Sequence, residues 1–438
     1  MNELPKGWYL KKLGELCSVT YGKGLPVKNF KPSGYPVFGA NGVIGFYDKY
    51  LFDEPRVLIS CRGAASGKIN LSPAKCFVTN NSLVLDILVK EDLEKKFLFY
   101  ALTVATKTEL VTGTAQPQVT INNAIDLDIS IPALLEQKRI VTKIEELFSK
   151  LDKGIENLMT VQEQLIIYRQ AVLKWAFEGK LTNEYILKEE LPKGWCLKRF
   201  DHFFLGKPQN GLYKNVSEYG SGIKIIRIDG FYDGTILSDY NYKKVNISKD
   251  EIKKYCVSNG DILINRVNSV SHLGKCGIVK NISEDFVFES NIMKIKINKR
   301  LALPEYLSMY LSSLKGLKEL RKNAKQAVNQ ASINQTDVSN VIIPIPELIS
   351  EQLQIVAEIE SRLSVCDKLE ESINQSLQQA EALRQSILKK AFEGKLVPQD
   401  PNDEPASVLL ERIQAERATV VAKNATTRTR GKPARKQS

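Results

Sequence analysis

The chain has 438 residues, of which 43% are hydrophobic and 26% charged, and its formal net charge is +12 at pH 7. This length exceeds the roughly 250–300 residues that one hydrophobic core usually serves, so two domains with connectors are expected. Since no apolar run approaches the ~18 residues that span a bilayer and the sequence does not begin like a signal peptide, we expect a cytoplasmic protein without a membrane segment.

The positive charge is concentrated in residues 191–346 and in the tail from Arg417 to Ser438. Such an excess of Lys and Arg indicates a polyanionic partner. The tail is interpreted either as a disordered, solubilising end or as an additional phosphate contact. The seven cysteines include no C-x-x-C pair, so reduced thiols are expected rather than metal ligands or disulfides.

Short apolar segments separated by turn residues characterise residues 1–133. They predict strands at Val57–Ser60 and Ser82–Leu85, turns at Asn41-Gly42 and Arg62-Gly63, and a helix over Glu94–Ala105. This mixture predicts an α+β (mixed α/β) domain.

A long amphipathic pattern follows this domain. From Leu134 to Phe177 the apolar residues recur in steps of three and four, which predicts one helix that begins beside Pro132 and ends at Gly179. With a rise of 1.5 Å per residue, a helix of ~40 residues spans about 60 Å. The helical spacing of the aromatic residues favours packing between helices over stacking on bases. These residues are Tyr168, Trp175 and Phe177.

The second half of the chain repeats this order. Strands are predicted at Ile223–Ile228, Asp261–Asn265 and Ile292–Ile297, and a helix at Pro304–Leu320. A second long amphipathic helix then begins beside Pro346 and ends at Gly394.

Two short motifs occur twice and mark a copied unit. Leu-Pro-Lys-Gly-Trp spans residues 4–8 and 191–195, and Ala-Phe-Glu-Gly-Lys-Leu spans residues 176–181 and 391–396. Because an isolated amphipathic helix leaves its apolar stripe in water, the two long helices are predicted to form an antiparallel coiled coil with a pseudo-two-fold repeat. The alternative is that each helix packs on its own domain. A two-fold repeat suits the two half-sites of a DNA duplex.

Both domains also contain a strand that runs into a glycine-containing loop with one Arg and one Lys. Residues 57–62 followed by Gly67-Lys68 match residues 262–266 followed by Gly274-Lys275, and further on residues 118–122 match residues 330–334. Arg suits guanine, Asn suits adenine, and Lys and Arg bind phosphates. The predicted DNA-binding residues are Arg62 and Lys68 in the first domain and Arg227, Arg266, Asn268 and Lys275 in the second, with Asn80 and Asn81 as secondary candidates. The alternative for each is an ordinary solvated side chain.

Signatures of catalysis are missing from the sequence. It has no Asn-Pro-Pro-aromatic tetrapeptide of the kind that holds a flipped adenine. Residues 63–68 resemble a P-loop only superficially, because three residues rather than four separate the glycines and Ile69 replaces the required hydroxyl. His202 and His272 are the only histidines and are interpreted as structural or surface residues. No catalytic and no metal-binding residue is predicted.

The alternation of divergent domains and shared helices, with the two repeated motifs, resembles the specificity (S) subunit of bacterial type I restriction-modification systems. The resemblance covers essentially the whole chain. It implies two target recognition domains (1–133 and 191–346), two conserved helical spacers (134–190 and 347–397), and a short helix with a basic tail (398–438). Because the recognition domains of this family diverge strongly, no base-contacting residue is carried over.

The resemblance also implies a function and a set of partners. Such a subunit is not an enzyme: it recognises a bipartite, asymmetric site in double-stranded DNA and scaffolds two adenine-methylating modification subunits and the restriction subunits. It would bind no cofactor, whereas its partners would use S-adenosylmethionine, ATP and Mg²⁺. A self-contained DNA methyltransferase or nuclease and a non-enzymatic coiled-coil scaffold are the alternatives.

Overall fold

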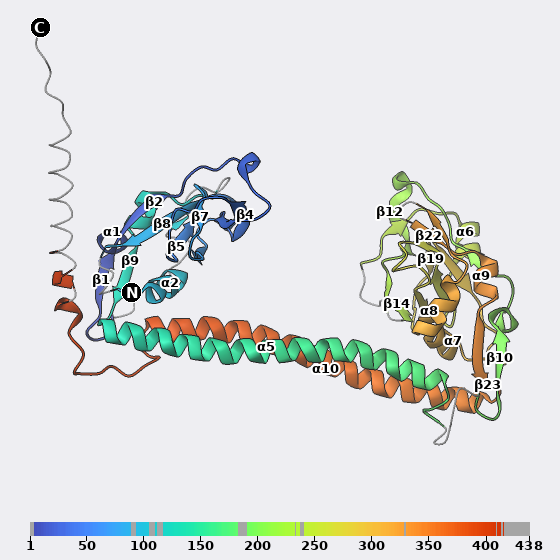
Figure 1. Cartoon of the computed structure of the whole chain (residues 1–438). Helices are drawn as coiled ribbons and strands as arrows, with labels where there is room; N and C mark the ends of the chain where they lie inside the picture. Colours follow the sequence, from blue (N-terminus) through green and yellow to red (C-terminus); the bar gives the residue numbers. More distant parts are fainter. Residues whose placement is uncertain are drawn as a thin grey trace, which may run out of the picture. The chain divides into compact units, whose positions relative to one another are not determined.

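The computed structural model describes residues 4–88, 93–104, 110–111, 117–182, 191–232, 234–236, 241–327, 330–408, 410–412 and 415 (Figure 1). The chain forms two compact units, of which unit 1 contains Met1–Asn157 and Ser376–Ser438, and unit 2 contains Leu158–Gln375. Each unit holds one globular domain and a part of each long helix, α5 (Leu134–Phe177) and α10 (Ile349–Phe392). The boundaries between domains and spacers stay predictions, because this division cuts through both helices.

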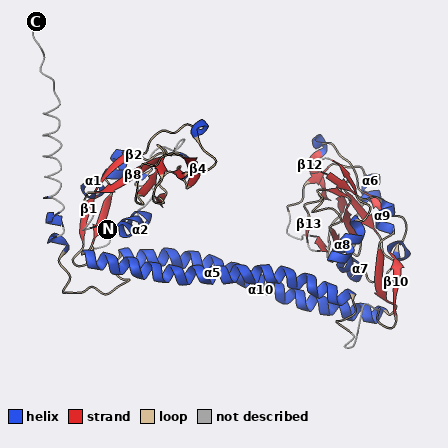
Figure 2. Cartoon of the chain, viewed as in Figure 1, coloured by secondary structure: helices blue, strands red, loops and turns tan. Residues whose placement is uncertain are grey.

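The domain of unit 1 combines small sheets with short helices (Figure 2). One antiparallel sheet has the order β2 (Cys17–Tyr21), β8 (Ser82–Ile87), β5 (Val57–Ser60), β6 (Ile69–Leu71); a second has β4 (Val43–Tyr47), β3 (Tyr35–Phe38), β7 (Phe77–Val78); and β1 (Tyr9–Lys12) pairs with β9 (Asp128–Ile131). The helical elements are α1 (Leu13–Leu16), η1 (Val27–Asn29), η2 (Gly63–Ala65), α2 (Lys95–Val104) and α4 (Ile121–Ile125).

The domain of unit 2 has the same kind of build and a larger sheet. That sheet has the order β11 (Gln209–Asn210), β20 (Ile292–Ile295), β16 (Ile262–Asn265), β18 (Cys276–Ile278), β14 (Gly234–Ile236), β13 (Phe231–Tyr232). Smaller sheets are β15 (Lys244–Val245), β12 (Tyr219–Ile226), β19 (Phe286–Phe288); β17 (Val267–Asn268), β22 (Gln330–Ser332), β21 (Lys325–Ala327); and β10 (Trp195–Arg199) with β23 (Ile342–Pro346). The helical elements are η3 (Phe200–Phe203), η4 (Val216–Glu218), α6 (Lys249–Tyr255), α7 (Pro304–Ser312), α8 (Leu314–Arg321) and α9 (Gln335–Ser339).

The mixed α+β prediction is confirmed, and one predicted helix is wrong in its extent. The pattern over residues 304–320 predicts a single helix, whereas the chain forms α7 and α8 with a break at Ser313. Ser313 has extended backbone angles (φ −71°, ψ 158°), and its hydroxyl accepts a hydrogen bond from the backbone N–H of Gly316 at 3.1 Å. A serine cap of this kind starts a new helix, which hydrophobic periodicity does not reveal.

A buried glutamine fixes the start of each long helix to its own domain. The Gln137 amide donates to the carbonyl oxygen of Pro132 at 3.0 Å, and its oxygen accepts from the backbone N–H of Glu94 at 3.0 Å. Gln352 makes the same two contacts in unit 2, with Pro346 at 3.0 Å and Leu303 at 2.9 Å. Both glutamines have no exposed surface, so each amide replaces hydrogen bonds that water cannot supply.

The helices end at the predicted glycines. Gly179 and Gly394 have left-handed backbone angles, with φ +75° and +68°. The next residues, Lys180 and Lys395, donate from the backbone N–H to carbonyl oxygens of the last turn at 2.9 and 2.8 Å. Glycine is favoured in this position because a side chain would be strained at positive φ.

The two long helices pair in antiparallel orientation within each unit. In unit 1 Asp152 of α5 forms an ion pair with Arg384 of α10, while Ile144, nearer the start of α5, shares a core with Ile387 further along α10. In unit 2 Arg169 contacts Asp367 at 2.7 Å and Glu370 at 3.0 Å. The predicted antiparallel coiled coil is therefore confirmed. The alternative, that each long helix packs on its own domain, applies to the first turns of each helix.

Candidate nucleic-acid interface

In unit 1 the second Ala-Phe-Glu-Gly-Lys-Leu motif packs against the first Leu-Pro-Lys-Gly-Trp motif. The rings of Phe392 and Phe97 have centroids 5.3 Å apart. Gly394 lies so close to the first motif that a Cβ added there would be 2.7 Å from Cβ of Pro5. The end of α10 thus belongs to the domain at the other end of the sequence, and glycine is required by space as well as by φ.

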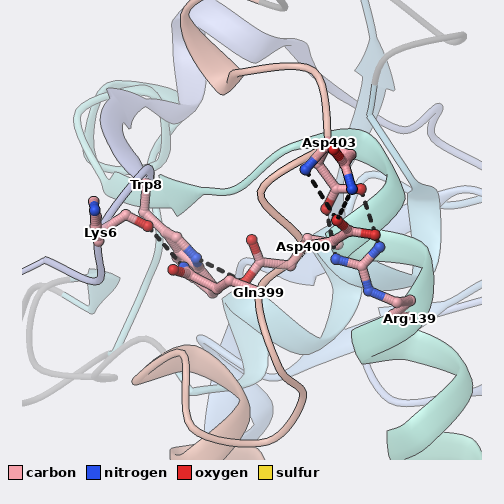
Figure 3. A network of polar contacts seen from close by, with 8 residues as sticks. Lys6, Trp8, Arg139, Gln399, Asp400 and Asp403 are labelled. Carbon is pink, nitrogen blue, oxygen red and sulfur yellow. Dashed lines mark hydrogen bonds and ion pairs between the residues drawn. The ribbon is translucent and has the colours of Figure 1, made fainter.

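A polar network fastens the segment after α10 to the same place (Figure 3). The indole N–H of Trp8 donates to Glu136 at 3.0 Å, and the side-chain amide of Gln399 donates to the carbonyl oxygen of Lys6 at 2.7 Å. Arg139 of α5 makes a two-pronged contact with the carboxylate of Asp403, at 3.1 and 2.5 Å. Burial raises the pKa of Glu136, although the bond from Trp8 lowers it. We call this set of contacts the C-terminal clasp.

Unit 2 joins the other pair of motif copies in the same way. Phe177 is buried at the end of α5, with ring centroids 5.3 Å from Tyr306 and 5.2 Å from Tyr310 of α7. The indole N–H of Trp195 donates to Glu351 at 2.8 Å, as that of Trp8 does to Glu136 in unit 1. The repeated motifs therefore build a similar frame in each unit, although Phe177 is buried and Phe392 only partly buried.

The two domains share a cage of backbone hydrogen bonds around one loop each, here called the strand-end loops (residues 61–66 in unit 1 and 266–273 in unit 2). In unit 1 the bonds run from Ser60 N to Lys68 O (2.9 Å), Gly67 N to Ser60 O (2.9 Å), Cys61 N to Asn81 O (2.9 Å) and Val119 N to Cys61 O (3.1 Å). In unit 2 the corresponding bonds, in the same order, run from Asn265 N to Lys275 O (2.8 Å), Gly274 N to Asn265 O (2.9 Å), Arg266 N to Asn291 O (2.9 Å) and Ile333 N to Arg266 O (2.9 Å). The cage is the same, while the enclosed loops differ in length and sequence.

This cage corrects one match made from the sequence. The sequence pairs Val119 with Ala331, but the equivalent hydrogen bonds pair Val119 with Ile333. Thr120 and Asn334, which follow them, both cap a short helix with their side chains, at α4 and α9. The sequence match is therefore shifted by two residues, because the shared Gln and Asn letters coincide in a register that the backbone does not use.

In unit 1 the predicted Arg62 and Lys68 lie at the two ends of the strand-end loop. Both are exposed. Lys68 donates from Nζ to the side-chain oxygen of Asn41 at 2.6 Å, and so ties the loop to the turn between β3 and β4. The secondary candidates Asn80 and Asn81 lie beside the loop, since their backbone oxygens accept from Cys61. The structure thus brings all four predicted residues of this domain together.

In unit 2 two predicted arginines already have protein partners. Arg227 contacts Glu289, with Nε 3.3 Å from the carboxylate. Burial lowers the pKa of its guanidinium, but the charge of Glu289, the hydrogen bond to it and the charge of Asp229 together raise that pKa. Arg266 donates to the carbonyl oxygen of Ser290 at 3.0 Å, and its buried Nε has no partner among the described residues. Both are half-buried.

Asn268 and Lys275 lie within and just after the strand-end loop of unit 2. The side-chain oxygen of Asn268 accepts from the backbone N–H of Ser269 at 2.8 Å. Lys275 occupies the position equivalent to Lys68. The two lysines are the only predicted residues that match each other position for position, whereas Arg62 is equivalent to Val267 and not to Arg266.

The aromatic residues of α5 divide into two groups. Phe177 is 3% exposed, but its ring packs on Tyr306 and Tyr310 of α7, which is a helix of the domain and not the other long helix. Trp175 is 45% exposed, and its packing on the other long helix stays a prediction. Tyr168 is 43% exposed and contacts Arg362 of α10. Helical spacing places all three near one stripe, but the crossing of the two helices decides which of them is covered.

The P-loop-like segment lacks the helix that follows a P-loop. Residues 63–68 lead from η2 into strand β6, whereas a P-loop leads into a helix that holds the phosphates. Within the described part of the chain, no group of three or more His, Cys, Asp or Glu side chains is arranged to hold a metal ion. No helix among the described residues is long and apolar enough to cross a membrane.

Sequence reasoning missed two residues near the loops. Asn41 was assigned only to a turn, yet it is the partner of Lys68. The sequence predicts only a structural or surface role for His272, yet it lies inside the strand-end loop of unit 2 and contacts two serines. The alignment of Lys68 with Lys275 was the available signal, because it placed both neighbourhoods in equivalent loops.

The chain matches the family model of the type I restriction modification DNA specificity domain at residues 5–160 and 205–379. It is 26% identical to the type I restriction enzyme EcoKI specificity subunit of Escherichia coli K12, covering 97% of this chain and 98% of that protein. It is 31% identical to the StySPI specificity subunit of Salmonella potsdam over 67% of this chain and 64% of that protein.

Solved structures share the fold. A chain from a structure of a type I R-M system, described in terms of its complex assembly and conformational transition, has a TM-score of 0.67 at 21% identity, covering 90% of this chain and all of that chain. The HsdS subunit of Thermoanaerobacter tengcongensis has a TM-score of 0.53 at 21% identity, with 90% and 98% covered.

Proposed function

Because the chain belongs to the family of type I restriction-modification DNA specificity subunits, we propose that each of its two domains reads one half of a bipartite, asymmetric DNA site. One observation carries the proposal. Both domains hold their strand-end loop by the same backbone hydrogen bonds, and the two loops differ in length and sequence. Two domains that share a backbone frame but present different side chains are suited to recognise two different half-sites.

The candidate side chains fall into three groups: those suited to phosphate contacts, those suited to base contacts and those that already have protein partners. Lys68 and Lys275 occupy equivalent positions on the cage and suit phosphate contacts, which place a domain on the duplex without reading bases. The exposed Arg62 and the loop residue Asn268 suit base edges. Arg266 is engaged with Ser290 and would orient the loop, whereas Arg227 is paired with Glu289.

As a specificity subunit the chain is not an enzyme and acts through partners. It would scaffold two modification subunits and the restriction subunits, and these would use S-adenosylmethionine, ATP and Mg²⁺, while this chain binds no cofactor. Exposed apolar side chains on α5 support a partner surface there, since Ile166 is 64% and Ile167 70% exposed. We expect the complex to act in the cytoplasm, where it would meet DNA.

Domain exchange tests the proposal. Replacing residues 1–133 by the equivalent domain of a relative, in complex with the modification subunits, should change one half of the methylated sequence and leave the other half unaltered. Mapping of methylated adenine across a genome measures this. A change in both halves, or methyl transfer by the purified chain alone, would contradict the proposal.

A lysine substitution tests the phosphate contact. Lys68→Gln should weaken binding to all DNA sequences by a similar factor and reduce the slope of log affinity against log salt by about 1. Lys75, which is exposed and on a different turn, provides the matched control as Lys75→Gln. An altered methylated sequence after Lys68→Gln would assign this lysine to base reading instead.

A further inference from the structure

The strand-end loop of unit 2 is two residues longer than that of unit 1, and its additional residues carry polar chemistry. Residues 266–273 stand where unit 1 has residues 61–66. Unit 1 places Gly, Ala, Ala and Ser after its arginine, whereas unit 2 places Ser269, Val270, Ser271 and His272 in the loop. Since the cage around both loops is the same, differences in reading must come from side chains of this kind.

His272 is held in a fixed orientation by two hydroxyl groups. Its Nδ1 lies 3.0 Å from Oγ of Ser269 and 2.9 Å from Oγ of Ser271, and the two hydroxyls are 3.1 Å apart. Ser271 and His272 are exposed and Ser269 is half-buried, so this small cluster lies at the surface of the loop. When one hydroxyl donates to Nδ1 and the other donates to that hydroxyl, the ring proton is on Nε2, and Nε2–H remains to meet a ligand.

The backbone beneath this cluster is clamped to a helix. Arg321 of α8 donates from Nε to the carbonyl oxygen of Leu273 at 2.7 Å and from a terminal nitrogen to that of Ser271 at 3.2 Å. Within the loop the N–H groups of His272 and Leu273 both donate to Ser269 O, at 3.0 and 2.9 Å. A side chain that reads a base must be preorganised, and both the ring and its support meet that requirement.

We propose that His272 is a specificity-determining residue of the second domain, with Nε2–H donating to the N7 atom of one purine in its half-site. The inference rests on the proposed function and goes beyond it by naming a residue and a base atom. In the major groove N7 is an acceptor on both adenine and guanine, and an exposed ring N–H is a suitable donor. Ser269 and Ser271 act as positioning residues for the ring.

Paired amide substitutions test the proposal in the complete complex with its modification subunits. In His272→Gln the amide nitrogen falls near the position of Nε2, whereas in His272→Asn it falls near Nδ1. We expect His272→Asn to lose roughly 10- to 100-fold of discrimination at one purine of the second half-site, and His272→Gln to retain most of it. The measurements are the methylated sequence and the binding of duplexes changed at single base pairs.

Two controls keep the result interpretable. His202 is the other histidine and is exposed on η3, so His202→Asn should behave like the native chain. The double substitution Ser269→Ala with Ser271→Ala frees the ring without removing it, and should weaken discrimination at the same base pair and nowhere else. A thermal unfolding curve for each variant establishes that the domain is folded.

A modified duplex identifies the atom. Replacing N7 of that purine by carbon should weaken native binding by the same factor as His272→Asn, and should cause no further loss in the variant. Equal weakening for all sequences, or native discrimination in His272→Asn, would overturn the inference. If the native complex methylates no bipartite site, the proposed function fails; if it does and the variant reads the same bases, only this inference fails.

Discussion

The two units differ where the domain meets the long helices. In unit 1 the guanidinium of Arg384 lies over the ring of Phe148, 4.4 Å from its centroid, and Tyr100 packs edge-on against the same ring. In unit 2 the equivalent Arg169 borders a hollow of about 640 Å³, which is also lined by Leu363, the residue equivalent to Phe148. Both units have the arginine and its acidic partner. Unit 1 has the aromatic ring of Phe148 beside them, whereas unit 2 has Leu363 at the equivalent position.

The hollow in unit 2 also contains poorly satisfied polar groups. Ser308 Oγ and Gln170 Oε1 line it, are buried, and have no hydrogen-bond partner among the described residues. Unit 1 has in addition the C-terminal clasp, with Arg139 where unit 2 has Gln354. Charge pairs therefore set the register of the helices in both units, whereas shape complementarity and the clasp favour the stability of unit 1.

Removing the phenylalanine at the end of each long helix should give the largest difference in stability loss between the two units. Phe177→Ala deletes a buried ring that packs on two tyrosines, and should lower the free energy of unfolding of unit 2 by about 3–5 kcal/mol. Phe392→Ala should cost less, because Phe392 is only partly buried. Hydrogen exchange followed by mass spectrometry assigns each loss to its unit. Trp175→Ala, two residues away and 45% exposed, is the control; a loss as large as that of Phe177→Ala would contradict the packing assigned here.

Exchanging the residues at the equivalent positions 148 and 363 should make the stabilities of the two units more similar. Phe148→Leu removes the ring under Arg384 and should destabilise unit 1 by about 1–2 kcal/mol. Leu363→Phe places a ring beside the hollow and should stabilise unit 2 by about 0.5–1 kcal/mol. Denaturant unfolding of both variants measures these changes. The same substitution at the exposed Leu369 should have no effect, and destabilisation by Leu363→Phe would show that the hollow does not accept a ring.

Opening the clasp should have a smaller effect, confined to unit 1. Arg139→Gln installs the side-chain type found at the equivalent position of unit 2, and breaks the contact with Asp403. Since the arginine side chain is 35% exposed, we expect a loss of about 0.5–1 kcal/mol. Faster proteolysis near residue 403 measures the opening. A double-mutant cycle with Asp403→Asn should recover the coupling, and additive effects would mean that the pair contributes nothing.

The pH dependence of the clasp gives the smallest expected effect. Burial raises the pKa of Glu136 above its ordinary value of 4.5 in the folded chain. A raised folded pKa means that protonation favours the folded state, so this contribution is present at low pH and is lost as pH rises through the folded pKa. Glu136→Gln keeps an acceptor for Trp8 and should flatten the stability of unit 1 in the range just above pH 4.5. An unchanged profile would exclude Glu136 as the group responsible.

Much of the frame follows from the sequence, because its signals are local or repeated. The steps of three and four from Leu134 to Phe177 and the glycine at position 179 define a helix whose ends the structure reproduces. The repeated motifs mark the constant parts, since a copied sequence needs no knowledge of its neighbours. The break at Ser313 was missed, because a capping serine competes with a periodic pattern that continues on both sides.

The candidate interface was predictable only in outline. The pairing of Lys68 with Lys275 follows from the strand and glycine on either side, and the backbone cage supports it. The match of residues 118–122 with 330–334 was displaced by two residues, because it depends on which carbonyl each N–H meets. Likewise, the partner of Lys68 is Asn41, far earlier in the chain, and no spacing rule connects them.

The sequence by itself therefore determined that a unit was copied, where its long helices begin and end, and which family the chain belongs to. Tertiary structure decided which motif copy meets which: the end of α10 packs on Trp8 and Phe97, and the end of α5 on Tyr306 and Tyr310. It also decided that the strand-end loops are equivalent while their contents differ. The physical reason is that helix periodicity and capping act within a few residues, whereas docking, burial and loop cages depend on groups that only the folded chain brings together.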